Sequence, residues 1–297
     1  MLISTQTDLF GYKFGEHEAI KLLAEIGYNA LDYSMFHMLV QNNPLNQNDY
    51  KDYAKSLRKT ADENNIIFNQ SHAPFPSYIQ FPNENQINTG YNETIVYYII
   101  RAMEVTSILG GKIMIVHPIT LQNYTYREQK DFNINFFKNL LPYCKKFNVQ
   151  IALENMWGWD DISKKATIGV CSDANEFVDY LDSLDKDYFV ACLDIGHSEM
   201  FRNDSSLTIE LINALGHDKL KALHIHDNNK LNDLHTLPFT QNINWNQVMN
   251  ALKSINYDGD FTYEADNFIS KFPVELYINA SAFMLDVGRY FIKTYEL

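Results

Sequence analysis

The sequence predicts a single (β/α)8 barrel, and three observations support that fold class. Short apolar segments alternate with longer amphipathic segments along all 297 residues, and eight such pairs can be counted. This alternation implies parallel strands joined by helical crossovers, and eight βα units in a chain of this length are typical of a closed barrel. No linker rich in Pro, Gly or Ser divides the chain, so we expect one domain over residues 1–297.

Each element is assigned from its periodicity and its flanking residues. The predicted strands are Leu2–Thr5, Ala30–Tyr33, Ile66–Ser71, Lys112–His117, Gln150–Glu154, Phe189–Asp194, Leu220–His226 and Asp260–Glu264. The predicted helices are Glu16–Ile26, Asn48–Asn64, Glu93–Leu109, Arg127–Phe147, Ser172–Leu184, Ser206–Leu215, Trp245–Ile255 and Phe272–Tyr290. An open doubly wound sheet is the alternative, but no phosphate-binding glycine motif follows the first strand.

Composition and charge narrow the functional class. The formal net charge is −13 and the pI is about 5.1, and no basic patch stands out, so we expect no nucleic-acid partner. The three cysteines show no CxxC spacing, which favours a reducing compartment. No signal peptide and no apolar run long enough to span a bilayer is evident, so we expect a soluble cytoplasmic protein with no membrane partner. The 19 Tyr and 19 Phe leave room for a homo-oligomer interface.

Polar side chains gather where the predicted strands end. The last inward-pointing residues of the third to eighth strands are His72, His117, Glu154, Asp194, His226 and Glu264. His197 and the pair Asp233 and His235 follow closely in the sequence. The carboxyl ends of barrel strands surround one mouth, where barrel enzymes carry their active sites. We therefore expect the active site at this mouth.

The segment 223–235 contains three of the nine histidines. By strand alternation, His224 and His226 share one face, opposite Leu223 and Ile225. His224 lies two residues deeper, so we expect it inside the barrel behind the ligands, and we expect His226 at the mouth.

Carboxylates and imidazoles that converge in one pocket cannot all remain charged and unpaired, because desolvation and like-charge repulsion are costly. A divalent cation would neutralise the carboxylates and bind the imidazoles. Nitrogen and oxygen ligands without thiolate suit Mn, Co, Zn or Fe, and also Mg if waters complete its coordination.

Seven short segments in order resemble the xylose isomerase-like barrel superfamily, which holds sugar isomerases and epimerases together with endonuclease IV. The segments are residues 71–74 (SHAP), 116–118 (VHP), 152–155 (ALEN), 193–197 (LDIGH), 224–227 (HIHD), 233–235 (DLH) and 263–265 (YEA). One departure is the loop after His235, which reads TLPFTQN where the family commonly has a Pro-Gly-x-Gly turn.

The resemblance implies a site for one divalent metal (Mn, Co, Mg or Zn). Its ligands would be Glu154, Asp194, His226 and Glu264. Two of these, Glu154 and Glu264, would also act as catalytic acid and base. The remaining residues, His72, His117, His197, Asp233 and His235, would bind substrate hydroxyls or additional metal ions. Trp157, which follows Glu154, is expected to contact the substrate, and so is Asp160, where some epimerases carry an acidic contact.

The predicted activity is therefore a metal-dependent isomerisation or epimerisation of a sugar or polyol, by proton transfer next to a carbonyl through an enediolate. Three alternatives remain open. One is a dehydratase or isomerase that acts on a cyclitol or keto-sugar with the same site. Another is an endonuclease IV-like hydrolase with up to three Zn ions. The third is a barrel that binds a ligand without catalysis.

Overall fold

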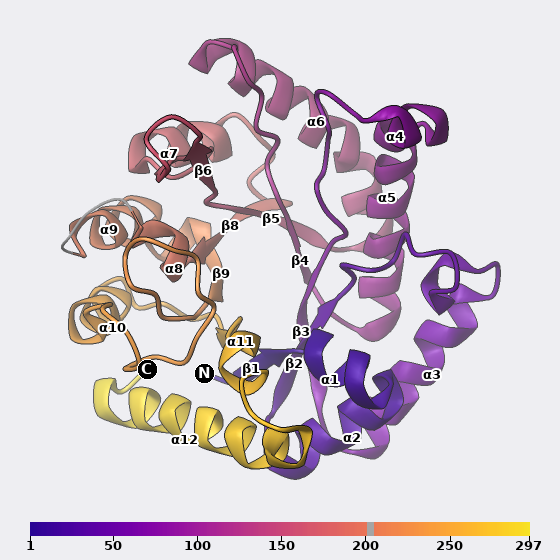
Figure 1. Ribbon diagram of the computed structural model, residues 1–297, viewed down its shortest axis with the longest axis vertical. Helices are drawn as coiled ribbons and strands as arrows, with labels where there is room; N and C mark the ends of the chain where they lie inside the picture. The colour runs from indigo at the N-terminus through magenta and orange to yellow at the C-terminus, as the bar shows by residue number, and fades with distance from the viewer. Residues whose placement is uncertain (201–204) are drawn as a thin grey trace.

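The computed structural model describes residues 1–200 and 205–297, and its centre is a ring of parallel strands (Figure 1). In spatial order, the strands are β10 (Phe261–Tyr263), β1 (Ile3–Gln6), β2 (Ala30–Ser34), β3 (Ile67–His72), β4 (Ile113–Val116), β5 (Gln150–Glu154), β8 (Phe189–Asp194) and β9 (Leu220–His224). The ring closes just beyond β9, where the amide of Ile225 donates to the carbonyl of Thr262 at 2.9 Å. The predicted (β/α)8 barrel is confirmed.

Helices cover the outside of the ring (Figure 1). They are α2 (Glu16–Ile26), α3 (Tyr50–Glu63), α5 (Tyr91–Leu109), α6 (Tyr126–Phe147), α7 (Ala174–Asp182), α9 (Ser206–Lys219), α10 (Trp245–Ser254) and α12 (Tyr277–Tyr295). Most boundaries lie within two residues of the prediction. The last helix begins five residues later than expected, because Pro273 starts a separate 3-10 turn, η2 (Val274–Leu276).

Two apolar layers hold the barrel together. The larger layer fills the space between the strands and the surrounding helices. A small inner layer lies inside the barrel and consists of Ile115, Ala152, Val190, Cys192 and Ala222, with Ile113 packed against it. Branched and small side chains thus close the interior below the mouth, as in other barrels of this class. The polar residues that follow them along the same strands lie above this floor.

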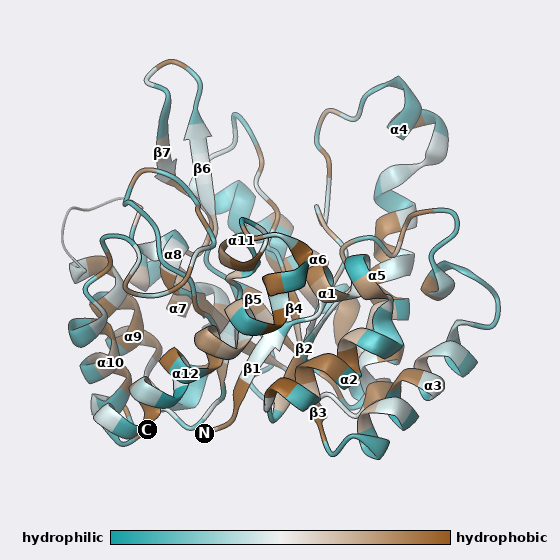
Figure 2. Cartoon of the chain, turned by 60° about the horizontal axis from the view of Figure 1, so that its bottom comes forward, coloured by the Kyte–Doolittle hydropathy of each residue, from teal (hydrophilic) through white to brown (hydrophobic). Residues whose placement is uncertain are grey.

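Several short elements that were not predicted surround the mouth, because each is inserted after the carboxyl end of a strand. The largest is an antiparallel hairpin of β6 (Trp157–Asp160) and β7 (Lys165–Ile168), which projects beyond the barrel (Figure 2). The others are α1 (Asp8–Phe14), η1 (Pro44–Asn46), α4 (Glu84–Thr89), α8 (Ile195–Ser198) and α11 (Asp266–Ile269). Among the described residues, no helix is long and apolar enough to cross a membrane.

Candidate metal centre and active site

A cavity of about 490 Å³ opens at the carboxyl ends of the strands. Its volume is that of an ordinary small-molecule site. The predicted residues that line it are His72, His117, Glu154, Trp157, His197, Asp233, His235 and Glu264. Gln6, Asp8, Phe36, Phe75, Met156, Asp266 and Asn267 complete the lining. Asp194 and His226 are fully buried and belong to the walls behind it.

Four side chains at the base of the mouth form what we call the carboxylate cluster: Glu154, Asp194, His224 and Glu264. Each offers a ligand atom within 4.8 Å of the others. The Nδ1 atom of His224 lies 3.0 Å from Oε1 of Glu154 and 3.0 Å from Oε2 of Glu264. Three carboxylates from β5, β8 and the end of β10 therefore converge around one imidazole.

The imidazole in this cluster is that of His224, whereas the prediction placed His226 with the three carboxylates. The pairing of β8 with β9 explains the arrangement. Its register shifts between Ala191 and Cys192, so that Asp194 is the partner of His224. The shift places one additional residue on β9 and brings His224 to the level of Asp194. His226, two residues further along, then lies above the cluster.

Two buried side chains hold the carboxylate cluster in place, and the prediction selected neither. Nε2 of His224 lies 3.2 Å from Oδ2 of Asp32, a fully buried residue of β2. The side chain of Gln6, at the end of β1, donates to Oε1 of Glu264 at 2.6 Å. Groups that bind the far side of a ligand fix its orientation and tune its basicity. The sequence signal for Asp32 was an acidic residue within an otherwise buried strand.

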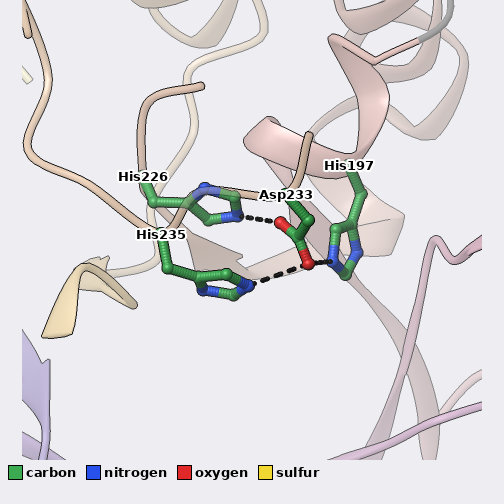
Figure 3. A group of neighbouring side chains, drawn as sticks. All are labelled: His197, His226, Asp233 and His235. Atoms are coloured by element: carbon green, nitrogen blue, oxygen red, sulfur yellow. Dashed lines mark hydrogen bonds and ion pairs between the residues drawn. The ribbon is translucent and has the colours of Figure 1, made fainter. Parts of the chain in front are cut away.

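A second group, the histidine cluster, comprises His197, His226, Asp233 and His235 (Figure 3). Oδ2 of Asp233 lies 3.0 Å from Nε2 of His235 and 3.3 Å from Nε2 of His197. Oδ1 of Asp233 lies 3.6 Å from Nε2 of His226. The two clusters touch, because Nε2 of His226 is also 3.0 Å from Oδ1 of Asp194.

A third set of neighbouring ligand atoms comes from His72, His117 and Glu154. Nε2 of His117 lies 3.0 Å from Oε2 of Glu154 and 3.0 Å from Nε2 of His72. Glu154 therefore belongs to two of the three sets. The four expected metal ligands and the five residues expected to bind substrate hydroxyls or further ions all lie in this continuous array at the mouth.

Asn155 and Gly196 shape the backbone beneath the array. The Asn155 side chain donates to the carbonyl of Asp194 at 2.9 Å and accepts from its amide at 2.7 Å. It thus ties the end of β5 to the end of β8. Gly196 lies against the His226 ring, because a Cβ atom there would be only 1.8 Å from Cε1 of that ring. The glycine is therefore required for the position of His226.

Electrostatics keep the two glutamates of the carboxylate cluster ionised. Burial alone would raise the pKa of Glu154, but His224 and His117 hold it well below its ordinary value. The pKa of Glu264 is lowered in the same way, against burial, by His224 and His235. Burial would lower the pKa of His235, but Glu264 and Asp233 raise it to about 10. The array is therefore a set of charges that compensate one another.

The residues of the array fit a divalent cation. Three of their buried atoms make no well-aligned hydrogen bond to a described residue: Nδ1 of His226, and Oε2 of Glu154 and Oδ1 of Asp233, which have only imidazole neighbours at 3.0 Å and 3.6 Å. A buried polar atom without a partner costs free energy, and coordination to a cation would offset that cost. The donors are oxygen and nitrogen, which suit Mn, Co, Zn or Mg.

The two expected substrate contacts, Trp157 and Asp160, lie at opposite ends of β6. Trp157 lines the cavity, and its indole N–H donates to Oδ2 of Asp233 at 3.1 Å. Asp160 is not among the lining residues. Its carboxylate accepts from the amide of Ile162 at 2.8 Å and from the hydroxyl of Ser163 at 2.7 Å. Asp160 therefore stabilises the hairpin turn in this structure.

Sequence relatives are distant and of mixed description. An uncharacterised protein of Methanocaldococcus jannaschii is 26% identical over 201 residues, which cover 66% of this chain and 64% of that protein. A probable endonuclease 4 of Mycoplasmopsis agalactiae is 24% identical over 184 residues, covering 60% of this chain and 59% of that protein. The matched region thus spans less than two thirds of either relative.

Solved structures match the barrel over its full length. A D-tagatose 3-epimerase-like protein superposes with a TM-score of 0.74 at 18% identity, covering 100% of this chain and 98% of that chain. An IOLI protein with a bound zinc atom superposes with a TM-score of 0.71 at 17% identity, covering 99% of each chain. At these identities the likeness establishes the fold. The family model for the xylose isomerase-like TIM barrel matches residues 20–286, and the chain belongs to that family.

Proposed function

We propose that the protein is a metal-dependent sugar isomerase or epimerase. The observation that carries this proposal is the carboxylate cluster. Glu154 from β5 and Glu264 after β10 flank Asp194 and His224, which come from the two strands between them. Two ionised glutamates at the edge of one cavity suit proton removal and return beside a carbonyl. The D-tagatose 3-epimerase-like protein that shares the fold supports the same reaction class.

We propose Glu154, Asp194, His224 and Glu264 as the ligands of the cation. The choice of His224 rather than His226 rests on its 3.0 Å approach to both glutamates. Bound there, a divalent cation would polarise the substrate carbonyl and stabilise the negative charge that develops on its oxygen.

The chain's own groups would perform the proton transfers. Oε2 of Glu154 lies beside two imidazole nitrogens, Nε2 of His117 at 3.0 Å and Nε2 of His72 at 3.6 Å, and it would take up the substrate proton next to them. Glu264 keeps its orientation through Gln6 and would exchange a proton on the other side of the substrate. His72, His197 and His235 line the same cavity and would bind substrate hydroxyls. Trp157 would close one wall against the sugar.

Proton exchange in heavy water tests the proposal. The Mn-loaded protein is incubated with D-fructose, D-psicose or D-tagatose, and deuterium at the carbons next to the carbonyl is followed by NMR. We expect exchange with at least one ketose, and a loss of about 10²–10⁴-fold in Glu154→Gln and in Glu264→Gln. The matched control is Asp161→Asn, whose side chain is 87% exposed on the hairpin. Absence of exchange with every ketose would contradict the proposal.

The histidine cluster favours one second candidate, an endonuclease with three zinc ions. All five additional ligand positions of that class are present, and a probable endonuclease is among the relatives. Against it, the described lining of the cavity contains no Lys or Arg to bind phosphates, and the net charge is −13. Elemental analysis separates the two: about one ion per chain fits the isomerase, whereas three zinc ions with incision of abasic DNA fit the nuclease.

A further inference from the structure

A second cavity, of about 420 Å³, lies beside the active site, and we call it the α1 cavity. Its walls come from α1, the start of α2 and the segment that follows β2. Met35 and Leu45 are buried side chains of its lining. Tyr12 and Val40 line it too, although they are 77% and 56% exposed. Apolar side chains that remain exposed around a cavity mark a binding site for an apolar group.

The α1 cavity adjoins the active-site cavity. Asp8 lines both, and the consecutive residues Met35 and Phe36 line one cavity each. At this boundary, Nε2 of His37 lies 3.6 Å from Oδ1 of Asp8, with side chains 64% and 32% exposed. The side chains at this boundary are partly exposed, and a ligand that reached from the reacting centre into the α1 cavity would pass over Asp8.

The charges in the α1 cavity select the kind of group it accepts. Its carboxylates are Asp8 and Glu16, and the described lining contains no Lys or Arg. Oε2 of Glu16 accepts hydrogen bonds from the hydroxyls of Tyr33 and Tyr53. Such a site repels phosphate and carboxylate groups, and it favours an uncharged group.

We propose that the α1 cavity binds the part of the substrate remote from the reacting carbonyl, and that this part is an uncharged apolar group such as an aryl aglycone. The inference rests on the proposed isomerase or epimerase activity, and it narrows the class of substrate. The preferred substrate is then a glycoside whose sugar ring keeps a carbonyl group, since the proposed reaction moves a proton beside one, and sugar phosphates bind poorly.

Competition binding tests this assignment. The Mn-loaded protein is titrated in a calorimeter with phenyl β-D-glucopyranoside, methyl β-D-glucopyranoside and glucose 6-phosphate. We expect the phenyl glycoside to bind at least about tenfold more tightly than the methyl glycoside, because the ring leaves water. We expect the phosphate to bind most weakly. D-fructose should compete with the phenyl glycoside, since both occupy the reacting centre.

Gly11 of α1 offers a variant that fills the cavity. It lines the α1 cavity, and a Cβ there would meet only Cγ of Glu16, at 3.5 Å. The Gly11→Leu variant should bring the affinities for the phenyl and methyl glycosides together. Tyr12→Ala should also reduce this preference, because it weakens binding of the phenyl glycoside. The matched control is Lys21→Leu, on α2 but outside the lining, where the side chain pairs with Glu18; it should keep the preference.

Three results would overturn the assignment: equal affinity for the two glycosides, a preference that survives Gly11→Leu, or phenyl binding that D-fructose does not displace. The readout is affinity, so it separates this inference from the proposed reaction. Proton exchange with a ketose but no preference for the aryl glycoside would reject only the assignment of a ligand to the α1 cavity. An aryl preference without any proton exchange rejects the reaction while leaving the cavity's ligand class supported.

Discussion

The carboxylate cluster and the histidine cluster lie in the same mouth but differ in depth and support. In the carboxylate cluster, Asp194 and His224 are fully buried on strands. The side chain of Asp32 contacts that of His224, and the side chain of Gln6 donates to that of Glu264. In the histidine cluster, Asp233 and His235 come from the loop after β9, and their side chains are 16% and 24% exposed. The first cluster is built into the barrel, whereas half of the second is carried on a loop.

The two clusters also differ in net charge. Three carboxylates around one imidazole concentrate negative charge and attract a hard cation. Three imidazoles around one carboxylate carry much less negative charge and can equally well bind substrate hydroxyls. The comparison teaches that depth and charge together, rather than the number of histidines, indicate where a permanent metal would bind. Each prediction below would sharpen or break this division.

The largest expected effect is that of His224→Ala on metal affinity. The variant removes the only imidazole of the carboxylate cluster, so we expect Mn affinity to fall at least about a hundredfold, as measured by titration calorimetry. The companion variant His226→Ala should retain most of the affinity. The reverse order would restore His226 as the ligand, as expected from strand alternation. Equal losses would mean that the two clusters hold metal together.

A smaller loss is expected from Asp32→Asn. The carboxylate of Asp32 lies 3.2 Å from Nε2 of His224 and accepts from the side chain of Gln70 at 3.0 Å. Its replacement by an amide should weaken metal binding by about tenfold to a hundredfold, because the ring of His224 loses its charged partner. Circular dichroism confirms folding. An unchanged metal affinity would show that His224 is not a ligand.

Gly196→Ala tests the histidine cluster, because it disturbs the packing of the His226 ring. The new methyl group would overlap the His226 ring, so we expect a loss of about 1–3 kcal/mol in the free energy of unfolding, measured by urea titration. Binding of one Mn ion should persist, since the side chain of His224 lies in the other cluster. If metal binding were lost as completely as in His224→Ala, the two clusters would not be independent.

The smallest effect is expected from His235→Ala. Its side chain belongs to the loop-borne half of the histidine cluster and is 24% exposed. We expect the variant to retain about one Mn ion per chain, with its loss confined to the KM for the sugar, as measured by proton exchange. Loss of the metal in this variant would favour a multi-metal site and hence the nuclease.

Much of the molecule follows from local patterns that can be counted in the sequence. The alternation of apolar segments predicts the eight βα units, since strand and helix periods are properties of neighbouring residues. Because the strands are parallel, their carboxyl ends must meet, and so Glu154, Asp194 and Glu264 are brought to one mouth. The hairpin of β6 and β7 was missed, because its four-residue strands are short and largely exposed.

Only the tertiary structure decided which imidazole joins the carboxylates. Alternation places His224 and His226 on the same face, and it cannot tell which of them lies level with Asp194. That choice depends on the shifted register between β8 and β9, which hydrogen bonds between distant segments establish. The support from Asp32 and Gln6 and the α1 cavity beside Asp8 likewise depend on packing between elements. The sequence determined the barrel and its mouth, because local periodicity sets them, whereas long-range register and packing set the geometry of the site.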